Sequence, residues 1–334
     1  MFGDIISHFE ALESERNYWF IRTMKGRHFD VFKTHGFIGI AWNYITTEHL
    51  LNSSAVEIKT LISENERNKD GDLYDINTAV GRRKITSIYN KIIRFKELKK
   101  GDFVVIPSAA SSILAFGIVD DDNIYSDFTD DRCDLYKRRK INWIVAKELD
   151  SLDPIFYKII FSKHAISSLD SYAGSIDKII NSIFIKDNKS HLVLNVKEKG
   201  DINYDSLNGV LTSVRALTEL INNSFLLNED LRDNSIKLNV QSPGAIEFIY
   251  KNGRSLLIAS VFLSMSNIVI SCDGNGLNSQ VIKSQNLDIM ENNIRNDSRF
   301  NEAEKTSLIE FSEVNYDNII RTKENMKEID AILE

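Results

Sequence analysis

The chain has little cysteine and little proline, and it has no recognisable export signal. Two cysteines, Cys133 and Cys272, are too few for a disulfide framework or a four-cysteine zinc site. Three prolines among 334 residues impose few breaks, so glycine becomes the main mark of turns. The first twenty residues contain no basic segment followed by an apolar core. We therefore predict no secretory signal and expect a cytoplasmic protein.

An excess of positive charge is also missing. Lys and Arg number 41 against 48 Asp and Glu, and the formal net charge is −7. This balance excludes a uniformly basic nucleic-acid-binding surface, although it leaves room for a local basic patch. The hydrophobic share of 43% and the charged share of 27% are typical of a globular protein. A length of 334 residues predicts two domains.

The sequence contains no catalytic or cofactor motif that we can identify. It has no His-Glu-x-x-His pattern and no Gly-x-Ser-x-Gly elbow, and neither cysteine has a motif around it. His28 and His35 have Asp30 nearby but no cysteine beside them, so we predict surface or capping histidines. The segment 273–276 (DGNG) is predicted to form a turn. The sequence therefore favours a protein that is not an enzyme, and it predicts no catalytic residue, no cofactor and no metal site.

Short apolar runs rich in β-branched and aromatic residues recur in the first 185 residues and predict strands. The runs are 38–42, 103–107, 113–119 and 140–145. Residues 86–98 have the apolar spacing of an amphipathic helix. Successive strands joined by turns, with few long helices, predict a small curled sheet or barrel.

From residue 190 the pattern changes to a β-α-β-β-α order, which predicts a compact second domain at 190–276. Its expected elements are a strand at 191–196, a helix at 205–221 capped by Asp205, a hairpin of 236–240 with 245–250 around the turn 241–244, and the apolar segment 256–272. The polar tail 277–334 has a thin apolar stripe at Ile319, Met326, Ile329 and Leu333. It predicts docked or oligomer-forming helices, with a loosely held terminus as the alternative. The fold class expected for the whole chain is α+β.

Six segments, taken in order, resemble one known superfamily. They are 18–22 (YWFIR), 36–42 (GFIGIAW), 93–95 (IRF), 99–107 (KKGDFVVIP), 115–119 (AFGIV) and 138–143 (RRKINW). Together they are similar to the PUA/EVE-like superfamily, and within it to the N-terminal domain fused to Mrr-type restriction nucleases, over about residues 15–185. The resemblance implies a curled sheet whose open face carries aromatic residues and holds an extruded or modified base, in a domain spanning 1–185. It also implies a reader whose catalysis is supplied by a partner.

Three tryptophans, Trp19, Trp42 and Trp143, lie in the matching segments and are the candidate base-binding residues. A flat indole stacks on a base with about 1–3 kcal/mol. Arg22, close to Trp19, is a candidate for contact with a phosphate or a base edge. The alternative is that these tryptophans are ordinary core residues.

Basic residues concentrate in two places. Residues 82–100 hold eight basic side chains against one acidic, Glu97, and residues 137–140 form a run of four. Such clusters beside an aromatic pocket are suited to neutralising phosphates. A solvated helix face is the alternative. The candidate phosphate-binding residues are Arg82, Arg83, Lys84, Arg94, Arg138, Arg139 and Lys140.

The function that these observations favour is a sensor of modified or flipped bases in DNA or RNA, in bacterial anti-phage defence or restriction. One alternative is a metal-dependent nuclease that uses Glu247 and Lys251, or the acidic loop 120–134, which we otherwise interpret as solvated. Another is an effector or scaffold acting through 256–272, a segment of 17 uncharged residues that is too short to span a membrane. A homo-oligomer or a partner effector protein fits these alternatives, and a membrane partner is not expected.

Overall fold

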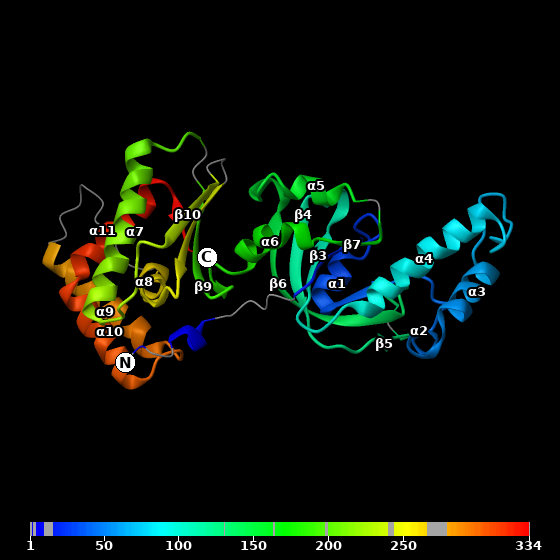
Figure 1. Cartoon of the computed structure of the whole chain (residues 1–334), viewed down its shortest axis with the longest axis horizontal. Helices are drawn as coiled ribbons and strands as arrows, with labels where there is room; N and C mark the ends of the chain where they lie inside the picture. The colour runs from blue at the N-terminus through cyan, green and yellow to red at the C-terminus, as the bar shows by residue number, and fades with distance from the viewer. Residues whose placement is uncertain are drawn as a thin grey trace. The chain divides into compact units, whose positions relative to one another are not determined.

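The computed structural model describes residues 2, 5–9, 16–129, 131–162, 164–197, 200–239, 244–265 and 279–333. The chain forms two compact units. The first unit is Glu15–Ile180, and the second unit combines Met1–Ser14 with Asn181–Glu334. Each unit contains its own sheet together with helices (Figure 1). The fold class is therefore α+β, as the sequence predicts.

The sheet of the first unit is curled and has the strand order β2-β6-β4-β3-β1-β7, with β5 paired to β6 (Figure 1). β1 and β3 run parallel, and the other neighbouring pairs are antiparallel. Its strands are β1 (Tyr18–Ile21), β2 (Phe37–Ile40), β3 (Phe103–Pro107), β4 (Ile113–Val119), β5 (Tyr125–Ser126), β6 (Lys137–Glu148) and β7 (Ile166–Ser168).

Helices cover both faces of this sheet, which explains why β3 is apolar at every position. Val104 and Ile106 pack into one cluster with α1 and α4, whereas Phe103 and Val105 pack into another with α5 and α6. All five residues of β3 are buried. A strand covered on both faces reads as a continuous apolar run, because neither side meets water. The helices are α1 (Phe29–His35), α2 (Thr47–Asn52), α3 (Ala55–Asn65), α4 (Ala79–Glu97), α5 (Phe156–Ile160) and α6 (Ala173–Ile180), with short 3-10 turns η2 (Ala109–Ser111), η3 (Leu149–Ser151) and η4 (Asp170–Tyr172).

Helices α2, α3 and α4 form an insertion between β2 and β3, and α3 packs along α4 (Figure 1). Thr46 and Ser54 begin α2 and α3 with capping boxes, and the Thr78 hydroxyl accepts the Gly81 N–H at the start of α4. The buried face of α4 carries Ile85, Ile88, Ile92 and Phe95. Because these residues recur at helical spacing, the opposite face of α4 is left to solvent.

Gly117 makes room for an indole in the middle of the sheet. It pairs with Trp143 across the β4–β6 ladder, at a register shift between Phe116 and Gly117. A Cβ atom at position 117 would lie 2.6 Å from the Trp143 ring and 2.6 Å from Ile141 Cγ2. Only glycine therefore lets Trp143 lie across the strand at this point.

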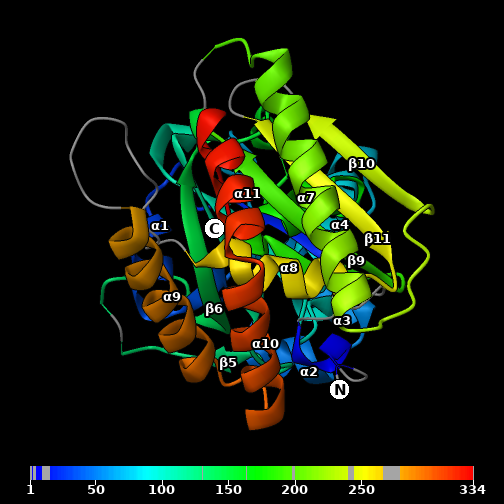
Figure 2. The same ribbon diagram turned by 90° about the vertical axis from the view of Figure 1, so that its left-hand side faces the viewer.

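The second unit places helices α7, α8 and α11 against a sheet of order β10-β11-β9-β12, with β8 paired to β9 (Figure 2). Its core includes the predicted stripe residues Ile319, Met326 and Ile329, so the tail is docked within this unit. The strands are β8 (Ile183–Lys186), β9 (Lys189–Val196), β10 (Asn234–Asn239), β11 (Gly244–Lys251) and β12 (Ala331–Ile332). The helices are η1 (Ile5–His8), α7 (Tyr204–Ser224), α8 (Arg254–Ser264), α9 (Ser279–Asn296), α10 (Glu302–Val314) and α11 (Tyr316–Glu328).

The division of the chain differs from the expected 1–185, 190–276 and 277–334. The boundary lies at 180/181, and the tail belongs to the same unit as the β-α-β-β-α segment. The extreme N-terminus belongs there too, because Phe2, Ile5 and Phe9 are buried in the core of the second unit. Several expected features lie outside the described residues: 241–243 of the hairpin turn, the expected turn 273–276, and 266–272 of the apolar segment with Cys272. Asp130 of the acidic loop lies outside them too.

Candidate nucleic-acid interface

The outward face of α4 forms one wall of a groove of about 610 Å³, which we call the α4 groove. The arginines Arg82, Arg83 and Arg94 and the lysine Lys91 lie along it, and His164 faces it from the loop between α5 and β7. The remaining lining residues are Ala79, Thr86, Ser87 and Asn90. The structure therefore brings three of the seven predicted phosphate-binding residues together on one surface.

The positive charges of the α4 groove have no ion-pair partner among the described residues, although Glu66 attracts Lys91 at a longer distance. Among the described residues, Arg82, Arg83, Lys91 and Arg94 form no ion pair with a carboxylate. Arg82 donates one hydrogen bond to the carbonyl of Asn77, and Arg94 donates one to the carbonyl of Ile166. Because a guanidinium has five N–H donors, both keep most of their donors for a ligand. A cluster of this kind attracts anions and binds phosphate oxygens in particular.

Lys91 connects the α4 groove to Trp42. Its Nζ atom lies 5.7 Å from the centroid of the Trp42 ring, within the range of a cation–π contact. Burial, and then repulsion from Lys84, lower the pKa of Lys91. Lys84 itself is exposed on the same helix but does not line the groove, and its Nζ atom lies 5.8 Å from the ring of Tyr74.

Trp19 and Trp143 have their indole N–H groups bonded inside the protein. Trp19 Nε1 donates to Asp102 Oδ2 at 3.0 Å, and Trp143 Nε1 donates to the carbonyl of Phe32 at 2.8 Å. All three indoles, including Trp42, are half-buried and pack against the core that contains α4. The structure thus shows a cation–π contact between Trp42 and a groove residue, whereas the indole N–H groups of Trp19 and Trp143 are engaged inside the protein.

Arg138 and Arg139 are buried, which corrects their assignment as phosphate-binding residues. Both have only 2% of their surface exposed, because β6 is covered along this stretch. Arg138 pairs with Asp127 at 2.7 Å and lies over the ring of Phe37. Arg139 donates to the carbonyls of Phe95 and Lys96, at the C-terminal end of α4. Their charges stabilise the fold rather than a ligand.

Two further predicted binding residues, Arg22 and Lys140, already interact with groups of the protein. Arg22 donates to the carbonyls of Ile160 and Ser162 and lies over the ring of Phe20. Lys140 is exposed, and its Nζ atom lies 3.9 Å from Asp121. Neither residue lines the α4 groove.

Glu247 and Lys251, proposed for a nuclease, do not form a metal site among the described residues. Glu247 is 2% exposed and bonds to His191 Nδ1 at 2.8 Å, whereas Lys251 pairs with Asp233. In the acidic loop, Asp122 accepts the backbone N–H of Lys100. Glu247 and Asp122 are thus each held by groups of the protein, whereas Asp134, at the end of the acidic loop, lies beside His28.

The apolar segment 256–272 has no exposed apolar face where it is described. Residues 256–263 lie in α8 and are buried throughout. The effector alternative therefore lacks a surface in this part of the segment. Within the described residues, no helix is long and apolar enough to cross a membrane.

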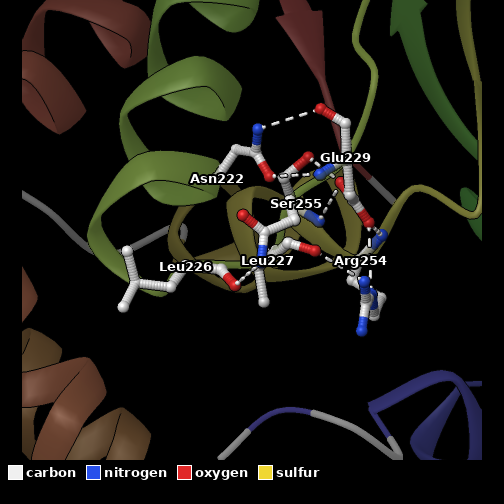
Figure 3. A network of polar contacts seen from close by, with 7 residues as sticks. Asn222, Leu226, Leu227, Glu229, Arg254 and Ser255 are labelled. Atoms are coloured by element: carbon white, nitrogen blue, oxygen red, sulfur yellow. Dashed lines mark hydrogen bonds and ion pairs between the residues drawn. The ribbon is translucent and has the colours of Figure 1, made fainter.

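The N-terminus of α8 is closed by the protein itself (Figure 3). The carboxylate of Glu229 accepts the backbone N–H groups of Arg254 and Ser255 and the Ser255 hydroxyl. Asn222 in turn bonds both the N–H and the C=O of Glu229. Because the N–H groups of Arg254 and Ser255 are satisfied internally, this network holds the loop that carries Glu229 in place.

His28 is buried, with 1% of its surface exposed, which corrects its prediction as a surface or capping residue. Its side chain makes no cap hydrogen bond at the start of α1. Burial lowers the pKa of His28, although the nearby Asp134 raises it. His35 is exposed in the last turn of α1.

Sequence reasoning did not single out Lys91 or His164 for the groove. Lys91 belongs to the basic stretch, and its spacing from Arg83 and Arg94 on one helix could have indicated it. His164 has no such signal, because only the fold places its loop beside α4.

The chain was compared with protein families, curated proteins and solved structures. A family model described as a domain of unknown function (DUF8426) matches residues 21–170. No significant similarity to a curated protein or to a solved structure was found. The matched range lies within the first unit and contains every residue that lines the α4 groove.

Proposed function

We propose that the first unit binds nucleic acid by seating phosphates in the α4 groove. The observation that carries this proposal is a set of cations, Arg82, Arg83, Lys91 and Arg94, that lie along one groove without a carboxylate partner among the described residues. The chain that carries them has a net charge of −7. A negatively charged protein gains little from such a cluster unless it meets an anionic partner.

The finer part of the proposal is that this binding reports modified or flipped bases in bacterial anti-phage defence or restriction. It rests on the resemblance of the first unit to the PUA/EVE-like superfamily and on the contact between Lys91 and Trp42. Phosphates would lie along α4, and Trp42 would be the indole nearest to a captured base. The second unit would then assemble the protein or pass the signal to a partner effector.

A salt series on the full chain tests the proposal. The triple variant Arg82→Gln, Arg83→Gln and Arg94→Gln should bind DNA or RNA oligonucleotides more weakly than the unmodified protein. The slope of log K against log salt concentration should become shallower by about 0.7–0.9 for each phosphate that the variant no longer neutralises. Oligonucleotides with and without base modifications, compared at one salt concentration, test the finer part.

A charge-matched control separates the groove from general electrostatics. Lys33, Lys69 and Lys158 are exposed residues of the same unit that do not line the groove. Changing all three to Gln removes the same net charge and should leave the slope near that of the unmodified protein. Equal slopes for the two triple variants would contradict the proposal.

A further inference from the structure

A thiol, an imidazole and a carboxylate meet in the first unit, and none of the three residues lines the α4 groove. Cys133 Sγ lies 3.7 Å from His28 Nδ1, and His28 Nε2 lies 3.3 Å from Asp134 Oδ1. One ligand atom from each residue can be chosen so that all three lie within 4.8 Å of one another. Among the described residues, it is the only group of three or more His, Cys, Asp and Glu side chains whose ligand atoms lie this close together.

The separations fit a shared ion. Zinc binds sulfur at about 2.3 Å and imidazole nitrogen at about 2.0–2.1 Å, so two such ligands at a tetrahedral angle lie roughly 3.5 Å apart. The observed 3.7 Å between Sγ and Nδ1 is close to this value. Cys133 and His28 are 2% and 1% exposed, whereas the side chain of Asp134 is 53% exposed. An ion can therefore enter from the side of Asp134.

One ring nitrogen of His28 is poorly satisfied by hydrogen bonds inside the protein. His28 Nε2 is buried and makes no well-aligned hydrogen bond among the described residues, although Asp134 Oδ1 lies 3.3 Å away. A buried polar atom without a partner costs about 1–3 kcal/mol. An ion bound to Nδ1 beside Cys133 Sγ would fix the proton on Nε2, from which it can be directed at the Asp134 carboxylate.

The loops that carry the three residues are held in place. The backbone carbonyl of Cys133 accepts a hydrogen bond from Arg138, and that of Asp134 accepts one from Asn43. The His28 ring stacks on Phe32 at a centroid distance of 5.7 Å and an interplanar angle of 21°. A site on such a frame needs little reorganisation to take up a ligand.

We propose that His28, Cys133 and Asp134 form a site for one divalent transition-metal ion of the zinc class. The three side chains supply nitrogen, sulfur and oxygen ligands, and water occupies the remaining position. The ion would tie the loop that follows β1 to the loop that precedes β6 and so stabilise the first unit. This site is independent of the proposed nucleic-acid binding.

Titration of the full chain with Co²⁺, after treatment with a chelator, tests the site. We expect one equivalent to bind with a thiolate-to-cobalt charge-transfer absorption that Zn²⁺ abolishes by displacement. Cys133→Ser should remove this absorption and lower the affinity by about 100-fold or more, since even outer-shell changes cost about 10–100-fold. The absence of a charge-transfer band would overturn the proposal.

Two controls keep the test decisive. Cys272→Ser changes the other cysteine, and a band that survives Cys133→Ser but is lost in Cys272→Ser would overturn the assignment. Asp134→Asn alters an exposed side chain and is expected to fold, so it tests the third ligand if Cys133→Ser proves unstable. It should weaken Co²⁺ binding while keeping the band, and an unchanged affinity would contradict the three-ligand site.

Discussion

Lys91 Nζ lies 5.7 Å from the centre of the Trp42 indole, and the same lysine lines the α4 groove. Trp42 has a positive φ of 64°, and its carbonyl accepts a hydrogen bond from the buried Lys137 at 2.8 Å. The indole is therefore held at a defined place beside the groove. A ligand that displaces or neutralises Lys91 must change the surroundings of Trp42.

Nucleic-acid binding should consequently be visible in tryptophan fluorescence. We expect titration with an oligonucleotide to change the emission, and Trp42→Phe to remove most of that change. Trp143→Phe is the control, because the Trp143 N–H is bonded to Phe32 within the core. A signal that persists in Trp42→Phe and vanishes in Trp143→Phe would place the ligand elsewhere.

Arg139 should matter for stability and not for ligand binding. Arg139→Gln removes a buried guanidinium that bonds two carbonyls at the end of α4. We expect the free energy of unfolding to fall by about 3 kcal/mol, since hydrogen bonds to charged groups contribute about 1.5–3 kcal/mol each. All three tryptophans lie in the first unit, so denaturation followed by their fluorescence measures this unit.

The neighbouring exposed residue provides the comparison for Arg139. Lys140→Gln changes a charge on the same strand and should alter the free energy of unfolding by less than about 0.5 kcal/mol. Equal losses in the two variants would show that Arg139 does not stabilise the end of α4 specifically.

Gly117→Ala should destabilise the first unit by about 1–3 kcal/mol, because the new methyl group would overlap the Trp143 ring and Ile141. Gly174→Ala is the matched control. Position 174 lies in α6 and has no atom within 4 Å of a new Cβ, so this change should stabilise the unit by about 0.5–1 kcal/mol. Fluorescence-monitored denaturation measures both, and the predicted signs are opposite. A neutral Gly117→Ala would mean that Trp143 can move aside.

Lys137 predicts a pH dependence of stability. Burial lowers its pKa to about 8, whereas the unfolded chain keeps the ordinary value near 10.5. Between these values the unfolded state binds more protons, so the free energy of unfolding of the first unit should rise with pH. A shift of this size corresponds to at most about 3 kcal/mol.

The measurement for Lys137 is the difference between two proteins. Denaturation curves at pH 7 to 10 should show the unmodified protein gaining stability relative to Lys137→Met as the pH rises, because other titrating groups are common to both. Lys140→Met, an exposed lysine on the same strand, is the charge-matched control. A constant difference across this range would mean that Lys137 titrates normally.

Local pattern alone determined much of the first sheet. The expected strands 103–107 and 113–119 coincide with β3 and β4, and the expected helix 86–98 is the C-terminal part of α4. These elements were predictable because apolar periodicity follows from whether one or both faces are buried. The exposure of the basic side chains of α4 was also predictable, because a helix that buries one apolar face leaves the opposite face to solvent.

The tertiary structure alone decided which charges are available to a ligand. Arg138 and Arg139 have the same residue type as Arg82 and Arg83, yet β6 buries the first pair and α4 exposes the second. Residue type records the charge but not whether other segments cover it. The contact between His28 and Cys133, which are 105 positions apart, was likewise decided by the tertiary structure. Contacts between such distant segments depend on how the strands are ordered in the sheet.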